Sequence, residues 1–282
     1  MQSKYINSRK IAILMATYNG EKYIEEQLKS IQNQTFEDWT LYIRDDGSTD
    51  NTLQICHEIA SSDNRIIIIE EDKKENLGAA NSFLRLLSIV ESDYYMFSDQ
   101  DDVWKNNKIE ISFQACLENE KTGLPIVVHS DSTLVDSSLN LIVDSYWNAI
   151  NLDPDKLKTY YYLALSSYAQ GATMLFNYSA RKITLPLPTY KVMHDWWVST
   201  RTIKNKGSII SIKQPTILYR QHGENVLGVR WGEKAKITSR LKRINEVFKS
   251  SYNSYQRIKA DGYGSLLLFL YYKFKLTWIL HR

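Results

Sequence analysis

Residues 94–104 read Tyr-Tyr-Met-Phe-Ser-Asp-Gln-Asp-Asp-Val-Trp, an apolar run that ends in three carboxylates within four positions. Its apolar first half is typical of a buried strand, and the carboxylates of Asp99, Asp101 and Asp102 follow where that strand ends. Carboxylates this close repel one another unless a cation lies between them, and a divalent metal ion with oxygen ligands meets that need. A solvated acidic turn or a helix cap is the alternative, but three such residues directly after one strand favour a metal site.

Upstream of this stretch, strand-like and helix-like segments alternate. They are predicted strands at 11–15, 41–43 and 66–69 and predicted helices at 21–32, 53–59 and 76–90. The run at 66–69 is apolar throughout, as expected of a strand covered on both faces. Four strands joined by three helices predict an α/β protein with a mainly parallel, Rossmann-like sheet of nucleotide-binding geometry. Ligands bind outside the carboxyl ends of such strands, and these ends carry residues 17–19, 45–46 and 99–102.

The second half of the chain is less regular. Its predicted elements are helices at 108–117 and 194–203, strands at 126–130 and 171–176, and a hairpin of strands 208–212 and 216–218. Residues 136–168 are rich in aromatic side chains, and we expect them to form loops and short helices in a cleft wall. Pro215 in the hairpin indicates an edge strand, because proline cannot donate to a hydrogen-bond ladder.

Composition and motifs exclude several classes of protein. With 282 residues, 43% hydrophobic and 24% charged, the chain is globular. Cys56 and Cys116 lack a CxxC partner, so neither a disulfide framework nor a thiolate metal site is indicated, and a reducing, cytoplasmic compartment fits. We find no signal peptide and no run long enough to span a bilayer, and expect a soluble or peripheral protein. Phosphate-binding glycine motifs are absent, so phosphates would have to be held by a metal ion.

Residues 230–282 differ from the rest in charge. They carry 12 Lys and Arg against 3 Asp and Glu, whereas residues 1–229 have a net charge of −6. We therefore predict a domain at 1–229 and a basic helical extension at 230–282. Two amphipathic helices predicted within 234–282 would bind an anionic membrane surface at the inner face of the plasma membrane, the protein's own body, or a second subunit of a homodimer. Nucleic acid is disfavoured, because such helices suit a lipid or protein surface better than a groove.

Six polar segments carry a resemblance to a known family. Residues 16–20 (Ala-Thr-Tyr-Asn-Gly), 45–50 (Asp-Asp-Gly-Ser-Thr-Asp), 76–78 (Asn-Leu-Gly) and 98–102 (Ser-Asp-Gln-Asp-Asp) together resemble the family 2 glycosyltransferases of the GT-A fold. Residues 99–104, 194–197 (His-Asp-Trp-Trp) and 219–223 (Tyr-Arg-Gln-His-Gly) are similar to bacterial rhamnosyltransferase-like enzymes of surface polysaccharide assembly. The resemblance covers about residues 10–230. It implies a nucleotide-sugar half at about 10–105, an acceptor half at about 106–229, and transfer of a sugar from a nucleotide diphosphate to a hydroxyl.

On the donor side, the resemblance implies three groups of residues. A donor, either dTDP-rhamnose or a UDP-sugar, would contact Thr17, Tyr18, Asn19, Asn76, Gly78, Asp99 and Arg220, the last compensating phosphate charge. Asp45 or Asp46 would accept a hydrogen bond from the imide N–H of uracil or thymine, unless both only cap a loop. Asp101 and Asp102 would hold Mn²⁺ or Mg²⁺ against the diphosphate. His222 would reach the metal or the diphosphate, or is an exposed loop histidine.

On the acceptor side, Asp195 is the candidate catalytic base. It would take the proton from the acceptor hydroxyl, and its aromatic neighbours would raise its pKa and offer a stacking surface for a sugar. The alternative is an Asp favoured at a helix N-terminus by the helix dipole. A base on the face opposite the leaving group implies single displacement with inversion. The acceptor, a saccharide or a lipid-linked saccharide, would contact Gln170, Gly171, His194, Trp196 and Trp197.

Two rival functions remain open from the sequence. The run Asp99-Gln100-Asp101-Asp102-Val103 also resembles the D-x-D-x-[TV] motif of haloacid dehalogenase-like phosphatases. In those enzymes the motif follows the first strand of the sheet, whereas here it follows the fourth. A non-catalytic scaffold that kept the fold is the second rival, but a binding module has no need of a base beside a metal site. The transferase interpretation accounts for more of the polar segments.

Overall fold

The protein is described from a computed structural model, which describes residues 10–70, 75–166, 168–185, 187–188, 192–222, 254–256 and 258–280. The strands are β1 (Ile11–Thr17), β2 (Trp39–Asp45), β3 (Ile66–Ile68), β4 (Tyr94–Ser98), β5 (Val103–Trp104), β6 (Ile126–Val135), β7 (Leu141–Val143), β8 (Leu175–Asn177) and β9 (Ser208–Arg220). The α-helices are α1 (Ile24–Gln32), α2 (Thr52–Ser62), α3 (Ala79–Ile89), α4 (Lys108–Asn119), α5 (Tyr146–Ala149), α6 (Tyr160–Leu165), α7 (Tyr178–Thr184), α8 (His194–Lys204) and α10 (Leu266–Leu280). The 3₁₀ helices are η2 (Pro154–Lys156) and η3 (Gly171–Thr173).

The first half of the chain forms the parallel part of one sheet. Strands β3, β2, β1 and β4 lie side by side in that order and run parallel, as predicted. The register pairs Thr17 with Asp45 and Met15 with Ser98, so the carboxyl ends of β1, β2 and β4 meet at one edge. The expectation that the third strand is covered on both faces is wrong. Within the described sheet β3 is the outer strand, and Ile67 is 40% exposed.

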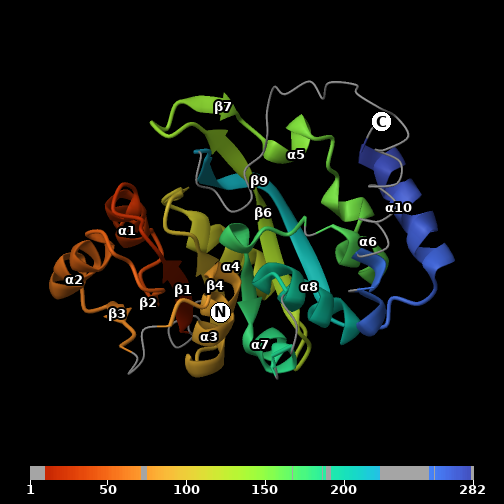
Figure 1. The fold of residues 1–282 in the computed structure, drawn as a ribbon, viewed down its shortest axis with the longest axis horizontal. Helices are drawn as coiled ribbons and strands as arrows, with labels where there is room; N and C mark the ends of the chain where they lie inside the picture. The colour runs from red at the N-terminus through yellow and green to blue at the C-terminus, as the bar shows by residue number, and fades with distance from the viewer. Residues whose placement is uncertain are drawn as a thin grey trace.

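The second half of the chain completes the sheet with antiparallel pairs. Strand β8 lies between β4 and β6 and is antiparallel to both, while β6 and β9 run in parallel through the middle of the molecule (Figure 1). The predicted hairpin at 208–218 is wrong, because β9 is one continuous strand. Its register shifts where Pro215 pairs with Asp131, so the missing N–H interrupts the ladder without reversing the chain. The predicted strand at 171–176 begins instead as η3 and becomes β8.

Two apolar clusters cover the two faces of the sheet. Alternate residues of β1 divide between them: Ile11 and Ile13 belong to one cluster, and Ala12 and Leu14 to the other. Helices α1, α2 and α4 contribute to the first cluster, and α3, α5, α6, α7, α8 and α10 to the second. The sheet is therefore a central layer between helices, which leaves its strand ends as the place where polar loops converge. Cys56 and Cys116 are buried in the first cluster and both are free thiols.

The described C-terminal segment packs on the acceptor half (Figure 1). It comprises helical residues 254–256 and 258–260 and helix α10. Tyr263 and Phe269 form a third apolar cluster with Ala164 of α6. The predicted domain boundary at 229/230 and most of the predicted basic helix lie outside the described residues. None of the described helices combines the length and the apolar character that a bilayer crossing requires.

His129 gives this fold a testable dependence on pH. Burial lowers the pKa of this β6 side chain to about 3. Below about pH 6.5 the unfolded chain binds a proton at this histidine, whereas the folded chain does not. As the pH is lowered from about 6.5 to about 3, the free energy of unfolding therefore decreases by up to about 1.4 kcal/mol per pH unit. We expect His129→Gln to flatten this fall between pH 6 and 4, as measured by urea unfolding. His57→Gln, at an exposed histidine, is the control, and equal slopes in both variants would contradict the prediction.

Candidate active site

The loops after β1 and β2 are bound together at the carboxyl edge of the sheet. Thr17 Oγ1 donates to Asp45 Oδ1 at 3.0 Å. Asp45 Oδ2 accepts the backbone N–H of Gly47 and of Ser48, at 3.1 and 2.8 Å. Asn19 has a φ of 46°, and its backbone N–H donates to Ser48 Oγ at 2.9 Å. The predicted donor residues Thr17, Asn19 and Asp45 therefore lie in one hydrogen-bonded unit.

Gln100 connects this unit to the acidic segment after β4. Its side-chain amide accepts from the backbone N–H of Tyr18 at 2.8 Å and donates to the Tyr18 carbonyl at 3.0 Å. A Cβ atom on Gly20 would lie 2.4 Å from Gln100 Oε1, so this approach needs glycine. The Tyr18 side chain is 48% exposed and available for stacking. Sequence reasoning missed Gln100, and its place inside the acidic cluster was the available signal.

Asp46 is buried and holds the loop before α3. Its Oδ1 pairs with Arg44 at 2.6 Å and accepts the Leu77 N–H at 2.8 Å, and its Oδ2 accepts the Gly78 N–H at 2.8 Å. Of the two candidates for base recognition, Asp45 is thus the more accessible. Asn76 is exposed at the same loop. Arg44 was missed from the sequence, where it directly follows the predicted strand at 41–43.

Three carboxylates from two elements approach one another. Asp99 and Asp101 follow β4, whereas Asp195 lies in the first turn of α8. Burial, and after it the charges of Asp101 and Asp195, raises the pKa of Asp99 to about 7. Asp99 and Asp101, on the predicted donor side, therefore lie close enough to Asp195, on the predicted acceptor side, for charges from both sides to affect the pKa of Asp99.

Asp101 lies beside His222, the most C-terminal of the predicted metal ligands. Asp101 Oδ2 is 2.8 Å from His222 Nε2, and the His222 ring lies 4.8 Å from the Tyr23 ring. No group of three or more His, Cys, Asp and Glu side chains in the described ranges is arranged to hold a metal ion. A carboxylate and an imidazole nevertheless fit an Mg²⁺ or Mn²⁺ ion that takes its remaining ligands from phosphates and water. These two residues would form the protein side of such a site.

Asp195 is held against the chain segment that precedes β8. Its Oδ2 accepts the Gly171 N–H at 3.3 Å and its Oδ1 the Trp196 N–H at 2.6 Å. The carboxylate is therefore oriented by two backbone donors at the start of a helix, next to the carboxylates after β4. This arrangement suits a fixed proton acceptor, and it also fits the alternative of an acidic residue at a helix N-terminus.

Comparison with known proteins decides the family. A sequence model described as glycosyl transferase family 2 matches residues 12–181, which is more than half of the chain. The chain belongs to glycosyl transferase family 2. Members of this family are transferases, so the protein is an enzyme of that class, and the phosphatase and scaffold alternatives lose their basis.

Relatives and solved structures extend the family assignment. The chain is 33% identical over 231 residues to the dTDP-rhamnosyl transferase RfbG of Shigella flexneri, covering 79% of this chain and 76% of that protein. It is 36% identical over 110 residues to the Escherichia coli glucosyltransferase WfgD, covering 39% of this chain and 42% of that protein. The structure of S. aureus TarS with UDP-GlcNAc has a TM-score of 0.58 at 20% identity, covering 77% of this chain and 60% of that chain. The predicted GT-A fold is confirmed.

Asp102 of this family 2 enzyme was predicted to be a metal ligand, but its side chain lies in the interior of the protein. It is fully buried, its Oδ1 accepts the Arg220 N–H at 3.1 Å, and its Oδ2 has no hydrogen-bond partner among the described residues. Burial, with the charges of Asp101 and Asp99, raises the pKa of Asp102 well above its usual range. Buried Lys108 interacts with it electrostatically, and burial lowers the pKa of Lys108 to about 7. Asp102 is thus part of the buried packing next to Asp101, where it bonds to the end of β9.

Arg220 is also placed differently from its predicted role at the phosphates. Its guanidinium is buried, and it donates to the carbonyls of Asp101 and Ser137 at 2.8 Å each and pairs with Glu26. The same group lies 4.6 Å from the centre of the Tyr23 ring. Because these contacts fix the backbone of Asp101 and the end of β9, Arg220 positions the Asp101 loop and the histidine two residues later.

His194 is an interior side chain, which corrects its prediction as an acceptor contact. Its ring lies 4.2 Å from that of Phe83 and 4.6 Å from that of Phe97, and neither ring nitrogen has a hydrogen-bond partner in the described part of the chain. Burial lowers the pKa of His194 to about 3. A Cβ atom on Gly171 would lie 2.5 Å from His194 Nε2. This close packing explains why η3 begins with glycine at the base of the Asp195 site.

The two tryptophans after Asp195 point to different surroundings. Trp197 is buried, and its indole N–H donates to the Thr184 carbonyl of α7 at 3.0 Å. Its predicted contact with the acceptor is therefore not supported by its placement. Trp196 is partly exposed, with its indole N–H 3.3 Å from the Ala164 carbonyl, and Gln170 is also partly exposed. Trp196 and Gln170 remain as predicted acceptor contacts.

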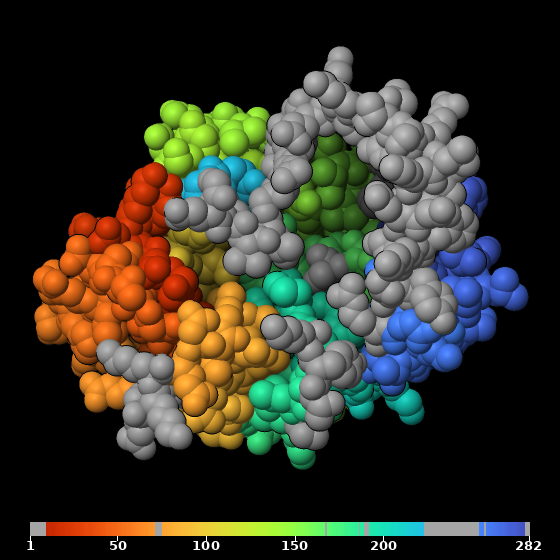
Figure 2. Space-filling view, in the orientation of Figure 1, coloured from red at the N-terminus to blue at the C-terminus, as the bar shows by residue number. Residues whose placement is uncertain are grey.

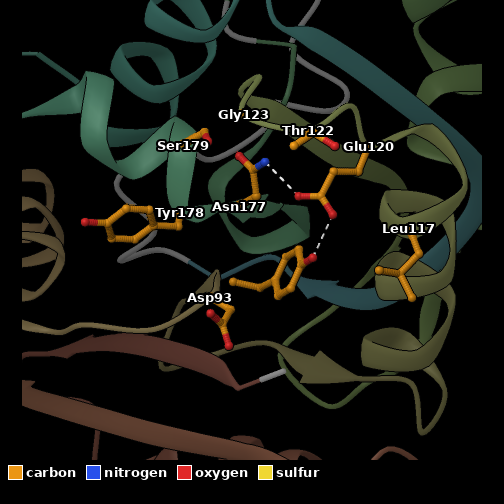
Figure 3. A pocket seen from close by; sticks show the side chains of 9 residues that line it. Asp93, Leu117, Glu120, Thr122, Gly123, Asn177, Tyr178 and Ser179 are labelled. Atoms are coloured by element: carbon orange, nitrogen blue, oxygen red, sulfur yellow. Dashed lines mark hydrogen bonds between the residues drawn. The ribbon is translucent and has the colours of Figure 1, made fainter. Parts of the chain in front are cut away.

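A separate cavity lies at the opposite, amino edge of β4 (Figure 3). It has a volume of about 440 Å³ and is lined partly by Asp93, Tyr94 and Asn177. Glu120 accepts hydrogen bonds from the Tyr94 hydroxyl at 2.7 Å and the Asn177 side-chain amide at 2.9 Å. The cavity shares no lining residue with the carboxylate edge, and three of its polar side chains, Glu120, Tyr94 and Asn177, bond to one another.

Proposed function

We propose that this enzyme transfers L-rhamnose from dTDP-rhamnose to a hydroxyl of a lipid-linked saccharide in bacterial surface polysaccharide synthesis. The similarity to RfbG over most of both chains carries the choice of donor. A lipid-linked acceptor is supported by WfgD, whose name specifies a diphosphoundecaprenol-linked sugar. A UDP-hexose donor is the second candidate, because WfgD uses UDP-Glc and TarS was solved with UDP-GlcNAc.

In this proposal the side chains around the carboxyl edge divide the reaction between them. Tyr18 stacks on the base, and Asp45 accepts its imide N–H. Asp195 takes the proton from the acceptor hydroxyl while that oxygen bonds to the anomeric carbon and the bond to the diphosphate breaks. Since the base and the leaving group lie on opposite faces of the sugar, the configuration inverts. Asp99 lies between the two sides and would contact the donor sugar.

Asp101 and His222 would hold Mn²⁺ or Mg²⁺. A bound divalent cation supplies neutralisation of the charge that develops on the leaving diphosphate. Asp102 and Arg220 are reassigned as positioning residues, since both are buried and both bond to the segments that carry the proposed ligands. The enzyme would work in the cytoplasm, peripherally at the inner face of the plasma membrane, where a lipid-linked acceptor is found.

A donor screen tests the proposed function directly. Purified enzyme is incubated with dTDP-rhamnose, UDP-glucose or UDP-GlcNAc, with Mn²⁺, Mg²⁺ or EDTA, and nucleotide diphosphate release is measured. Mass spectrometry on a lipid-linked acceptor then identifies the product. We expect metal-dependent release from dTDP-rhamnose and a mass increase of one deoxyhexose. Release from a UDP-sugar alone would replace the rhamnose assignment with the second candidate.

A pair of substitutions separates the metal ligand from the buried carboxylate. We expect Asp101→Asn to raise the Mn²⁺ concentration needed for half-maximal activity at least about tenfold, because it removes a charged ligand. Asp102→Asn is expected to leave that concentration unchanged, because the side chain is buried, this burial raises its pKa, and Asn has the same shape. Metal titration of donor turnover measures both. Equal shifts in the two variants would restore Asp102 as a ligand.

A further inference from the structure

Helix α10 presents an exposed apolar face. Leu267 is 79% exposed and Phe274 is 75% exposed, and Leu270, Tyr271 and Trp278 are exposed as well. Their spacing of three, four and seven residues places all five on one side of the helix. In Figure 2 this helix lies at the rim of the molecule, at the end of the chain's colour series. Several large apolar side chains gathered on one rim indicate an interaction surface.

The opposite face of α10 is already occupied by the protein. Tyr272 stacks on Tyr161 of α6 at 4.6 Å and meets Tyr162 edge-on at 5.2 Å. Phe269 and Leu276 are buried on the same side. Helix α10 is thus apolar on both sides. A helix that is apolar all round is typically buried on every side, in protein or in lipid. Packing on the body, one of the roles predicted for this segment, accounts for half of its circumference.

The charge and the length of α10 indicate what its exposed face contacts. From Leu266 to Leu280 the helix has no acidic residue, and Lys273 and Lys275 border the exposed face on its two sides. Tyrosine, tryptophan and lysine are enriched where a helix meets lipid headgroups. With 15 residues the helix is too short to cross a bilayer and suits a position in the plane of the interface. Pairing this face with a second copy would bring lysines of like charge together.

We propose that α10 docks the enzyme on an anionic lipid bilayer through Leu267, Leu270, Tyr271, Phe274 and Trp278. The docking face is coupled to the candidate active site through packed helices, because α6 contacts both α10 and α8, and α8 carries Asp195 (Figure 1). The bilayer would therefore adjoin the acceptor half. This coupling to acceptor delivery rests on the proposed function, whereas the docking itself does not.

Vesicle flotation of the full chain tests the docking. The protein is mixed with phosphatidylcholine vesicles with or without phosphatidylglycerol. We expect wild-type protein to float with the anionic vesicles, and Leu267→Ser with Phe274→Ser to lower the partition coefficient about a hundredfold. Lys273→Gln with Lys275→Gln should lower it about twentyfold, and added salt should mimic this loss. Ile67→Ser, an exposed apolar residue of the outer strand β3, is the matched control and should float like wild type.

Three outcomes would overturn the docking: no flotation of wild-type protein, unchanged flotation of the Leu267/Phe274 variant, or equal loss in the Ile67 control. Sedimentation of the same variants gives a separate result. A wild-type dimer that becomes a monomer in the Leu267/Phe274 variant, without vesicle binding, would show that a second copy covers the face. Flotation needs no donor, so a failure of rhamnose transfer with intact flotation would refute the proposed function and leave the docking standing.

Discussion

Replacing Asp195 by Asn is expected to lower kcat about a thousandfold while the dissociation constant of the donor stays within about twofold. Asn keeps the shape of the side chain and an oxygen that can accept the Gly171 N–H, but it cannot take a proton at neutral pH. The loss should therefore fall on the transfer step. Turnover with saturating donor and acceptor, together with calorimetric donor titration, measures the two quantities separately.

Ser199→Ala is the matched control for this prediction. Ser199 lies one turn further along α8, and its hydroxyl donates to the Asp195 carbonyl at 2.8 Å. Its removal disturbs the same helix without touching the carboxylate, so kcat should change by less than about threefold. A comparable loss in both variants would show that helix geometry, and not the carboxylate, limits turnover. Wild-type turnover in Asp195→Asn would eliminate Asp195 as the base.

Replacing Asp261 by Asn is expected to lower the free energy of unfolding of the C-terminal segment by about 2–3 kcal/mol. Asp261 is buried between this segment and the acceptor half, where it pairs with Arg201 and, at 2.7 Å, with Lys204 of α8. It also accepts from the Tyr160 hydroxyl of α6 at 3.1 Å. Both cations are 24% exposed and can partly regain water, which keeps the loss below that of a fully buried pair.

Limited proteolysis after residue 222 and urea unfolding measure the effect of Asp261→Asn. We expect faster cleavage of the C-terminal segment than in wild type. Asp155→Asn removes an exposed pair with Lys158 and should change stability by less than about 0.5 kcal/mol. If the two variants are cleaved and unfold alike, Asp261 does not hold the segment.

The sheet edge could be predicted because its determinants are local. Apolar runs end in Thr17, Asp45 and Asp99, and alternation with helices forces those ends to one side. The neighbourhood of Asp99 and Asp195 could not be derived from patterns, since it depends on the packing of α8 against the far half of the sheet. The resemblance of the segments around both residues, rather than periodicity, linked them to one reaction.

The placements that differ from the prediction share a physical cause. Asp101 and Asp102 are adjacent, yet only Asp101 lies beside His222, because Arg220, more than a hundred residues later, fixes which carboxylate turns inward. Trp196 and Trp197 likewise point to different sides of one helix, and contact with α7 decides which is buried. A residue's type indicates what chemistry it offers, whereas its direction is set by partners distant in sequence.

The position of β8 in the sheet has a consequence for synthesis and for fragments of the chain. Strand β4 pairs with β1 on one side and, through Tyr94, Tyr95 and Met96, with β8 on the other. Until residues 175–177 leave the ribosome, β4 is therefore an unpaired edge strand of a partly formed sheet. Its side chains are nevertheless mostly apolar and suited to a fully buried strand. Such an exposed edge strand can pair with strands of other incompletely folded chains. Fragments that stop before residue 175 should aggregate, and chaperone capture should be strongest at that nascent length.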